Sequence, residues 1–396
     1  MSDIIDDPEL RLLIAATARP ARQGHRDVIA AAAVSGAIDW PRFLLLVERH
    51  RVAPLAFGAV AELRDAVPAP VLSDLRAHAM RDRMQAMQSV HVLASVSAAL
   101  AAAGIDAISI KGPVLAQLAF GDVTLRQSHD IDLLIAPDDV VTAIAALEAA
   151  DCMVRPGVDA KDTARLKVLT RQMKDVSLVH RASVTLIELH WRLHPNPRLL
   201  PVASLPSRQT VQVGPFAART FGTDDLMLYL SAHGAKHHWF RLKWLSDLYA
   251  LLAPRPMEQL DAFYQRATEQ GLAVPVGQTL RMLEAVYGLS LPDRVRRHTD
   301  RSWRVRLLTR RALGYLAMMQ EPDEQWQASS VMALGNFGFR SDIGYVAREI
   351  AGQLVDKPTI FRTGGTRRGY ALAILGRPFL LIGRRIAAIL AARRRR

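Results

Sequence analysis

Residues 130–135 have the sequence DIDLLI, and this stretch decides which fold and which chemistry we expect of the chain. Successive side chains of a strand point to opposite faces, so Asp130 and Asp132 share one face while Ile131 and Leu133 point into the core. Two adjacent carboxylates repel each other unless a cation lies between them, and Mg²⁺ takes such ligands together with substrate phosphates and water. The alternative is a strand whose polar face happens to carry two acids. The apolar setting and the preceding glycine turn favour a metal site.

The residues before this strand predict a turn suited to phosphate binding. Residues 105–110 are typical of a short strand, and Lys111, Gly112 and Pro113 lead from it into a helix. Gly112 lets the backbone approach a phosphate, the helix start offers free N–H groups, and Lys111 adds positive charge. Many turns contain Lys-Gly, so this motif alone is weak. Arg126, in the loop before the acidic strand, is suited to neutralise triphosphate charge or simply to be solvated.

A third carboxylate follows further along the chain. Residues 136–150 predict a turn and a helix, and residues 175–180 and 184–191 predict two strands paired across a short turn. Glu188 lies between Ile187 and Leu189 in the second of these strands, where an unpaired buried carboxylate would be costly. A metal shared with the aspartates would remove that cost, and a solvated edge position would avoid it. We expect Glu188 to join the metal site.

Helical sequence patterns flank this mixed segment on both sides. Residues 8–100 are rich in Ala and Leu with few strand signals, and Pro68 and Pro70 punctuate them. A further helix is expected over 89–103, ended by Gly104, and after about Phe221 the chain is mainly helical again. The order predicts an α+β fold in which a small mixed β-sheet lies between helical layers. We expect an N-terminal helical region over 1–100, an α/β core over 101–220, a helical region completing a cleft over 221–330, and a basic helical tail over 331–396.

Composition bounds the class of protein. The chain has 396 residues, of which 50% are hydrophobic and 22% charged, so it is long enough for two or three domains and is not a disordered chain. Cys152 is its one cysteine, which excludes an intrachain disulfide and favours a reducing compartment. The acidic N-terminus lacks the order of a secretory signal. These features predict a cytoplasmic protein.

The net charge of +13 is concentrated near the C-terminus. Eleven basic residues and no acid lie between Lys357 and Arg396, which leaves +2 for the rest of the chain. A basic tail of this kind can bind RNA, anionic lipid at the inner membrane surface, or nothing specific. Residues 370–392 are apolar enough to suggest a membrane span, but three arginines and Pro378 interrupt them. An amphipathic basic helix and a helix packed on the body are the remaining alternatives.

His233 and His237 are four residues apart on an expected helix and therefore share a face. They could ligate zinc, but no HExxH arrangement and no cysteine partner accompany them. A helix that lines a nucleotide cleft, with His237 or Lys243 near phosphate, and ordinary packing are the alternatives. Trp239 and Trp244 are expected in the core.

Taken in order, these residues resemble the nucleotidyltransferases of the DNA polymerase β type. That superfamily has a glycine-containing turn, a strand bearing Asp-x-Asp or Asp-x-Glu, and a later strand with one more acid. The closer resemblance is to a bacterial family of uncharacterised nucleotidyltransferases and covers roughly residues 40–290. The motifs that carry it are residues 103–112, 126–135, 188–193, 233–239 and 241–248.

The resemblance implies attack on the α-phosphate of a nucleoside triphosphate, with ATP as the expected donor, and release of pyrophosphate. It assigns two Mg²⁺ ions to Asp130, Asp132 and Glu188, and makes Glu188 the acceptor of the proton. Nucleotide binding is implied for Lys111, Gly112, Arg126, His237 and Lys243. The superfamily usually has Gly-Ser or Gly-Gly at the turn, whereas this chain has Pro113, so the phosphate role falls to Lys111.

The acceptor is left open by the sequence. A small molecule or a peptide is favoured by analogy with the family. A toxin-like transferase acting on tRNA, and a non-catalytic homologue that binds nucleotide or a partner, are the alternatives. The base and the oligomeric state are also left open.

Overall fold

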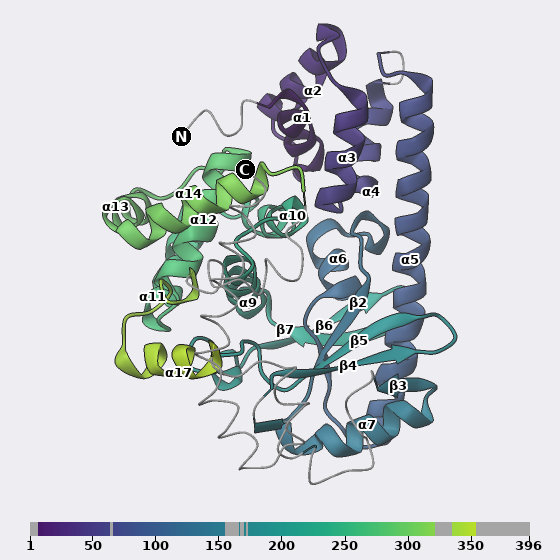
Figure 1. Cartoon of the computed structure of the whole chain (residues 1–396), viewed down its shortest axis with the longest axis vertical. Helices are drawn as coiled ribbons and strands as arrows, with labels where there is room; N and C mark the ends of the chain where they lie inside the picture. Colours follow the sequence, from purple (N-terminus) through teal and green to yellow (C-terminus); the bar gives the residue numbers. More distant parts are fainter. Residues whose placement is uncertain are drawn as a thin grey trace, which may run out of the picture.

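Two groups of helices enclose a small sheet in the computed structural model of the chain (Figure 1). The structure describes residues 7–63, 66–154, 166, 170–171, 173–320 and 335–353. Helices before the sheet are α1 (Pro8–Thr17), α2 (Gln23–Ser35), α3 (Trp40–His50), α4 (Ala53–Val60), η1 (Ala61–Leu63) and α5 (Ala69–Ala102). Helices within the sheet region are α6 (Gly112–Phe120), η2 (Val123–Leu125), η3 (Pro137–Asp139), α7 (Val140–Ala149) and η4 (Val202–Ser204). Those after it are α9 (Thr223–Lys236), α10 (Leu242–Leu252), α11 (Met257–Glu269), α12 (Ala273–Tyr287), α13 (Asp293–Arg301), α14 (Trp303–Leu316) and α17 (Ile343–Gln353).

The central sheet is mixed and has the strand order β1-β2-β5-β4-β3. Its strands are β1 (Ile108–Ser109), β2 (Asp130–Leu134), β3 (Cys152–Val154), β4 (Asp175–His180) and β5 (Thr185–His190). β2 and β5 run parallel, and the other neighbouring pairs run antiparallel. This sheet between helical layers confirms the predicted α+β class and the strands expected over 130–135, 175–180 and 184–191.

The sheet packs on α5, the longest described helix. Its 34 residues span about 50 Å at 1.5 Å per residue. Pro68 is its N-cap and Pro70 lies in its first turn, where a proline removes no helical hydrogen bond. The predicted helix over 89–103 is therefore the second half of α5, whose buried side chains share a core with α7 and β2, while those of its first half share a core with α3 and α4. Figure 1 shows α5 running past both the N-terminal helices and the sheet.

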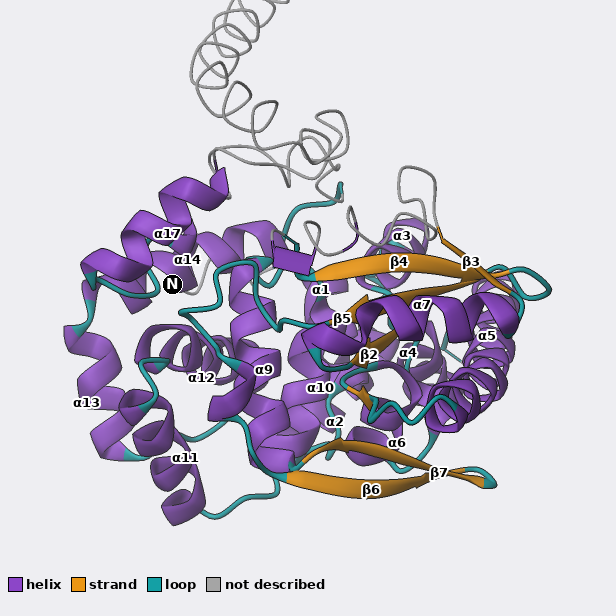
Figure 2. Ribbon diagram, turned by 90° about the horizontal axis from the view of Figure 1, so that it is seen from below, coloured by secondary structure: helices purple, strands orange, loops and turns teal. Residues whose placement is uncertain are grey.

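A second, two-stranded sheet was not expected from the sequence. β6 (Arg208–Val213) and β7 (Phe216–Phe221) form an antiparallel hairpin within the segment assigned to the end of the core. Seen from below, the hairpin lies on the opposite side of the molecule from β3 and β4, with the helices α9 to α14 beside both (Figure 2). β1 is also shorter than the strand predicted over 105–110, and β3 was not predicted.

The two faces of β2 divide as the alternation predicts. Ile131 and Leu133 are fully buried in a core shared with α5 and α7. A second core joins the N-terminal helices to α9, α10 and α12 through side chains such as Leu13, Trp239 and Tyr287. The acidic face of β2 is therefore turned away from the core that contains α5 and α7.

No helix within the described ranges is both long and apolar enough to cross a membrane. The predicted tail falls only in part within those ranges, as α17. Residues 354–396, including the basic run, lie outside the described residues.

Candidate active site

Strand pairing brings two of the three predicted carboxylates side by side. Asp132 on β2 is the direct partner of Glu188 on the parallel strand β5. His190, two residues beyond Glu188, points to the same face and stands opposite Asp175 of the antiparallel strand β4. One face of the sheet therefore collects acidic side chains from three strands, together with an imidazole.

His190 joins the two carboxylates. Its Nε2 lies 2.9 Å from Oδ1 of Asp132 and 3.2 Å from Oε2 of Glu188. The other ring nitrogen, Nδ1, lies 3.3 Å from Nζ of Lys174 and 3.7 Å from Oδ2 of Asp175. The imidazole is thus held on both edges, which fixes its orientation toward Asp132 and Glu188.

Lys111 adds a cation at the same oxygen of Asp132 that His190 contacts. Its Nζ lies 2.9 Å from Oδ1 of Asp132, and the side chains are only 10% and 1% exposed, so this is a buried ion pair. The turn that places it requires Gly112, whose φ of +67° is strained for other residues. The Lys-Gly motif therefore positions an ammonium group against the acidic strand.

These contacts set the ionisation of the site. Burial alone would raise the pKa of Asp132, but the Lys111 ammonium and the His190 hydrogen bond outweigh it and hold that pKa below its ordinary value. For the Lys111 amine, burial acts in the opposite direction and would lower the pKa, but the negative charge of Asp132 raises that pKa well above its usual range. The pKa of Glu188 is lowered overall, because the hydrogen bond from His190 and the charge of Lys111 outweigh burial and the repulsion of Asp132. Both carboxylates are therefore ionised at neutral pH.

The group Asp132, Glu188 and His190 fits a divalent cation. One ligand atom from each side chain lies within 4.8 Å of the others. Oδ2 of Asp132 is buried and has no hydrogen-bond partner among the described residues, which leaves a lone pair for a ligand. The side chain of Glu188 is 27% exposed, so the group opens toward solvent on that side. Asp130 lies one strand repeat away on the same face and is half-buried, outside this group.

The family comparison is consistent with this geometry. The sequence model of a family described as uncharacterised nucleotidyltransferase matches residues 36–288, which include every residue of the group. This chain belongs to that nucleotidyltransferase family. No curated protein and no solved structure gives a significant match. The predicted family is thereby confirmed, whereas its members' substrates are not given by the match.

Two of the residues predicted to bind nucleotide, Arg126 and Lys243, form contacts within the protein. Arg126 is buried, and its Nε donates to Oδ1 of Asp247 at 2.8 Å. Lys243, one helical turn before Asp247 on α10, donates from Nζ to the backbone carbonyl of Gln127 at 2.8 Å. Burial and then the neighbouring Arg126 lower the pKa of Lys243 well below its ordinary value. Both side chains fasten the loop before β2 to α10.

His237 caps the end of α9 and packs against other rings. Its ring centroid lies 4.7 Å from that of His233 and 5.4 Å from that of Trp244. Burial, followed by nearby lysines, lowers the pKa of both histidines well below the usual range, so the rings are neutral at pH 7. Trp239 is fully buried as predicted, and Trp244 is half-buried.

His190 is the site residue that sequence reasoning missed. It belongs to a motif that carries the family resemblance, but no role was assigned to it. The available signal was the strand alternation, because residues 188 and 190 of one strand share a face. Only the parallel pairing with β2 shows that this face meets Asp132.

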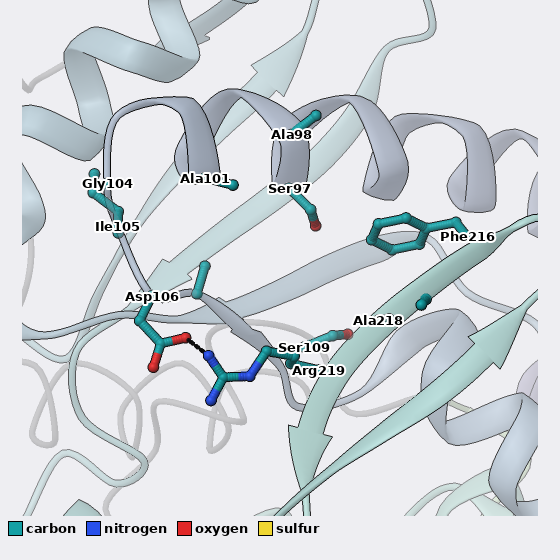
Figure 3. Close-up of a pocket in the computed structure, with 12 residues that line it drawn as sticks. Ser97, Ala98, Ala101, Gly104, Ile105, Asp106, Ser109, Phe216, Ala218 and Arg219 are labelled. Carbon is teal, nitrogen blue, oxygen red and sulfur yellow. Dashed lines mark hydrogen bonds and ion pairs between the residues drawn. The ribbon is translucent and has the colours of Figure 1, made fainter.

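A separate hollow lies beside β1, the strand that precedes Lys111. It has a volume of about 480 Å³ and is lined by the C-terminal half of α5, the segment before β1, and β7 (Figure 3). Two of its lining residues, Asp106 and Arg219, form an ion pair. Ser109 lines it and donates to the carbonyl of Lys111 at 3.1 Å. None of the predicted site residues lines this hollow, so it is distinct from the carboxylate group.

Proposed function

We propose that this protein transfers a nucleoside monophosphate from a nucleoside triphosphate, with ATP as the expected donor, to a hydroxyl or phosphate of a small-molecule or peptide acceptor. The observation that carries the proposal is the pairing of Asp132 with Glu188 and His190 on one sheet face. An ionised, buried carboxylate oxygen without a partner among the described residues supports a cation-binding role. Membership of a nucleotidyltransferase family supports the reaction class.

In the proposed reaction an acceptor oxygen forms a bond to the α-phosphorus, and the bond to the pyrophosphate oxygen breaks with its electron pair. Asp130, Asp132 and Glu188 would hold two Mg²⁺ ions, and bound ions neutralise charge on the phosphoryl group. His190 would become a further ligand by releasing the Nε2 proton that it shares with Asp132 and Glu188. We assign the acceptance of the acceptor's proton to Glu188, and its ionised state and its exposure, greater than that of Asp132, support this role. Lys111 keeps Asp132 ionised and fixed.

One contact favours a second candidate, a non-catalytic homologue. Lys111 and His190 already compensate Oδ1 of Asp132, which is the arrangement expected of a structural ion pair. In that case the protein would bind a nucleotide or a partner without turnover. The basic run between Lys357 and Arg396 is the feature that favours tRNA as the acceptor.

The test is pyrophosphate release from each nucleoside triphosphate with Mg²⁺, in the presence of fractionated cell extract. The small-molecule, peptide and RNA fractions identify the acceptor through a labelled nucleotide. Asp132→Asn should abolish release, while Asp138→Asn, an exposed acid just after β2, should leave it unchanged. Circular dichroism confirms folding of both variants. Turnover in folded Asp132→Asn would remove the metal assignment, and no release from any nucleotide with any fraction would favour the non-catalytic homologue.

A further inference from the structure

One face of α5 is apolar and open to solvent along much of the helix. The side chains of Met80, Met84 and Met87 are 45%, 70% and 54% exposed. Spacings of three and four residues place these methionines on one side of the helix, in line with the exposed His91. α5 runs along one edge of the molecule in both views (Figures 1 and 2). Large apolar side chains gathered on one exposed face mark a contact surface, whereas scattered single ones do not.

The same face carries only small side chains after His91. Ser95, Ala98 and Ala102 continue the helical spacing, and all three are exposed. Beside them lies the hollow of about 480 Å³, which Ala98 lines together with Phe216 of β7 (Figure 3). α5 therefore presents large apolar side chains before His91 and a recess after it.

The large and the small side chains are spaced symmetrically about His91. Met84 lies seven residues before it, and Ala98 lies seven residues after it. Met87 and Ser95 lie four residues before and after it. Two antiparallel copies of α5, related by a two-fold axis beside His91, would therefore place each methionine against a small side chain of the other copy. The same contact occurs twice in such an isologous pair.

The charges on α5 favour this antiparallel direction. Arg76 and Arg81 are exposed in the first part of the helix, whereas residues 92–105 contain no charged side chain. Parallel copies would bring the arginines of both chains together, and like charges repel. In the antiparallel pair Arg76 instead approaches Asp106 of the other copy, an exposed acid in an ion pair with Arg219.

We propose that this protein forms a two-fold symmetric dimer through α5. The two helices run antiparallel, with His91 beside the two-fold axis. Met84 of each copy packs on Ala98 of the other, and Met80 enters the hollow beside it. The methionine side chain is unbranched and flexible, so it fills an irregular recess. Asp132 lies on the sheet face turned away from the core of α5, so the dimer leaves the carboxylate group of each copy uncovered by α5.

Sedimentation velocity of the full chain over a range of concentrations tests the dimer. The wild type should show a reversible monomer–dimer equilibrium. Met84→Glu and Ala98→Lys should each weaken association about hundredfold or more, because each buries a charge against apolar groups twice in the symmetric interface. Both positions are exposed on a helix and both new residues are good helix formers, so the monomers should stay folded, as measured by circular dichroism. The matched control is Met257→Glu, at a 43% exposed methionine on α11, which should dimerise as the wild type does.

Combining Met84→Glu with Ala98→Lys tests the direction and the register of the helices. In the antiparallel pair the carboxylate at position 84 faces the ammonium at position 98 of the other copy, so the double variant should associate within about tenfold of the wild type. Within one chain the two positions are about 21 Å apart along α5, too far to compensate each other. An equimolar mixture of the two single variants should likewise form heterodimers. In a parallel pair position 84 would meet itself, and neither rescue would occur.

Four outcomes would overturn the proposed contact. They are a wild type that is monomeric at every concentration, a folded Met84→Glu that dimerises as the wild type does, a double variant that stays monomeric, and loss of the dimer in Met257→Glu. Met80→Glu provides the same test if Met84→Glu does not fold. None of these measurements depends on nucleotide turnover, so the dimer stands or falls separately from the proposed reaction.

Discussion

Lys111→Met tests whether the ammonium group holds Asp132 ionised inside the protein. Methionine keeps an unbranched apolar chain of similar length, so packing changes little while the charge is lost. The ion pair is buried, with Nζ and Oδ1 2.9 Å apart. Removing one partner of such a pair costs about 3–5 kcal/mol, because the other charge remains buried without compensation. His190 still donates to the same oxygen, which places the expected loss near the lower value, about 3 kcal/mol.

Thermal and urea unfolding measure this loss, and a double-mutant cycle isolates the pair. Lys111→Met combined with Asp132→Asn has neither charge, so it should be more stable than Lys111→Met alone by about 2 kcal/mol. Saturating Mg²⁺ or Mn²⁺ should restore stability to Lys111→Met, because a bound cation replaces the ammonium, and should not restore it to the double variant. If Lys111→Met unfolds as the wild type does, or if the double variant is no more stable than the single one, the argument for the ion pair fails.

The pH dependence of the stability of Lys111→Met gives an independent test of the ion pair. In the wild type the pKa of Asp132 is lowered, so its contribution to stability is present above the unfolded value near 4 and is lost as the pH falls below it. Without Lys111, burial should raise the pKa of Asp132 above its unfolded value. The stability of Lys111→Met should then increase as the pH is lowered from 7 toward 5, relative to the wild type. A parallel pH profile for the two proteins would contradict this reasoning.

Three other substitutions probe the site and its surroundings. Glu188→Gln should lower turnover by about two orders of magnitude with little change in melting temperature, and a large stability loss with normal turnover would mark Glu188 as structural. His190→Asn should weaken Mn²⁺ binding about tenfold or more in calorimetry, whereas His180→Asn, at the far end of β4, should not; equal affinities would remove His190 from the ligand set. Burial lowers the pKa of His50 well below 6.5, so its contribution to stability is present above pH 6.5 and is lost as the pH falls. His50→Asn keeps an acceptor for the backbone N–H of Leu242. Between pH 6.5 and 5 the free energy of unfolding of this variant should therefore fall less steeply than that of the wild type, by about 1.4 kcal/mol per pH unit. The same pH slope in both proteins, measured by urea unfolding at each pH, would refute this.

The role of the predicted tail is tested by measuring binding to vesicles and RNA beside the transfer activity. Truncation after Gln353 removes all eleven of the basic residues that follow Asp356. We expect salt-dependent binding to anionic vesicles or RNA to fall, while pyrophosphate release at saturating acceptor stays within about twofold, because screened surface charge acts on encounter and not on the transfer step. Vesicle co-sedimentation beside the release assay distinguishes the two, and loss of release would place the tail in the catalytic machinery.

Local sequence patterns were enough to predict the helices and strands whose patterns are most regular. Alternation of apolar and polar residues predicted β2 and β5, and the apolar faces are buried as that alternation requires. The order of the acidic strands and the Lys-Gly turn predicted the family. Pro68 and Pro70 were expected only to punctuate the helical region, and the helix expected over 89–103 is the second half of α5, because helix length depends on packing along its whole course.

The weaker elements depended on partners that are distant in the sequence. β1 has two residues and exists through its pairing with β2, and the hairpin of β6 and β7 has a half-exposed, mixed composition that does not predict strands strongly. Their stability comes from cross-strand and tertiary contacts, which a local pattern does not contain.

The sequence by itself determined which residue types are present for the chemistry: an Asp pair, a later Glu and a lysine before a glycine turn. Tertiary structure alone decided which of them meet. Parallel pairing of β2 with β5 placed His190 and Glu188 on Asp132, and the ammonium of Lys111 reached the same oxygen. It also placed Arg126 and Lys243 in internal contacts, and brought His50 and Leu242, 192 residues apart in the chain, into one hydrogen bond. The physical reason is that the energy of a charge interaction depends on the distance between the two groups in space and not on their separation along the chain.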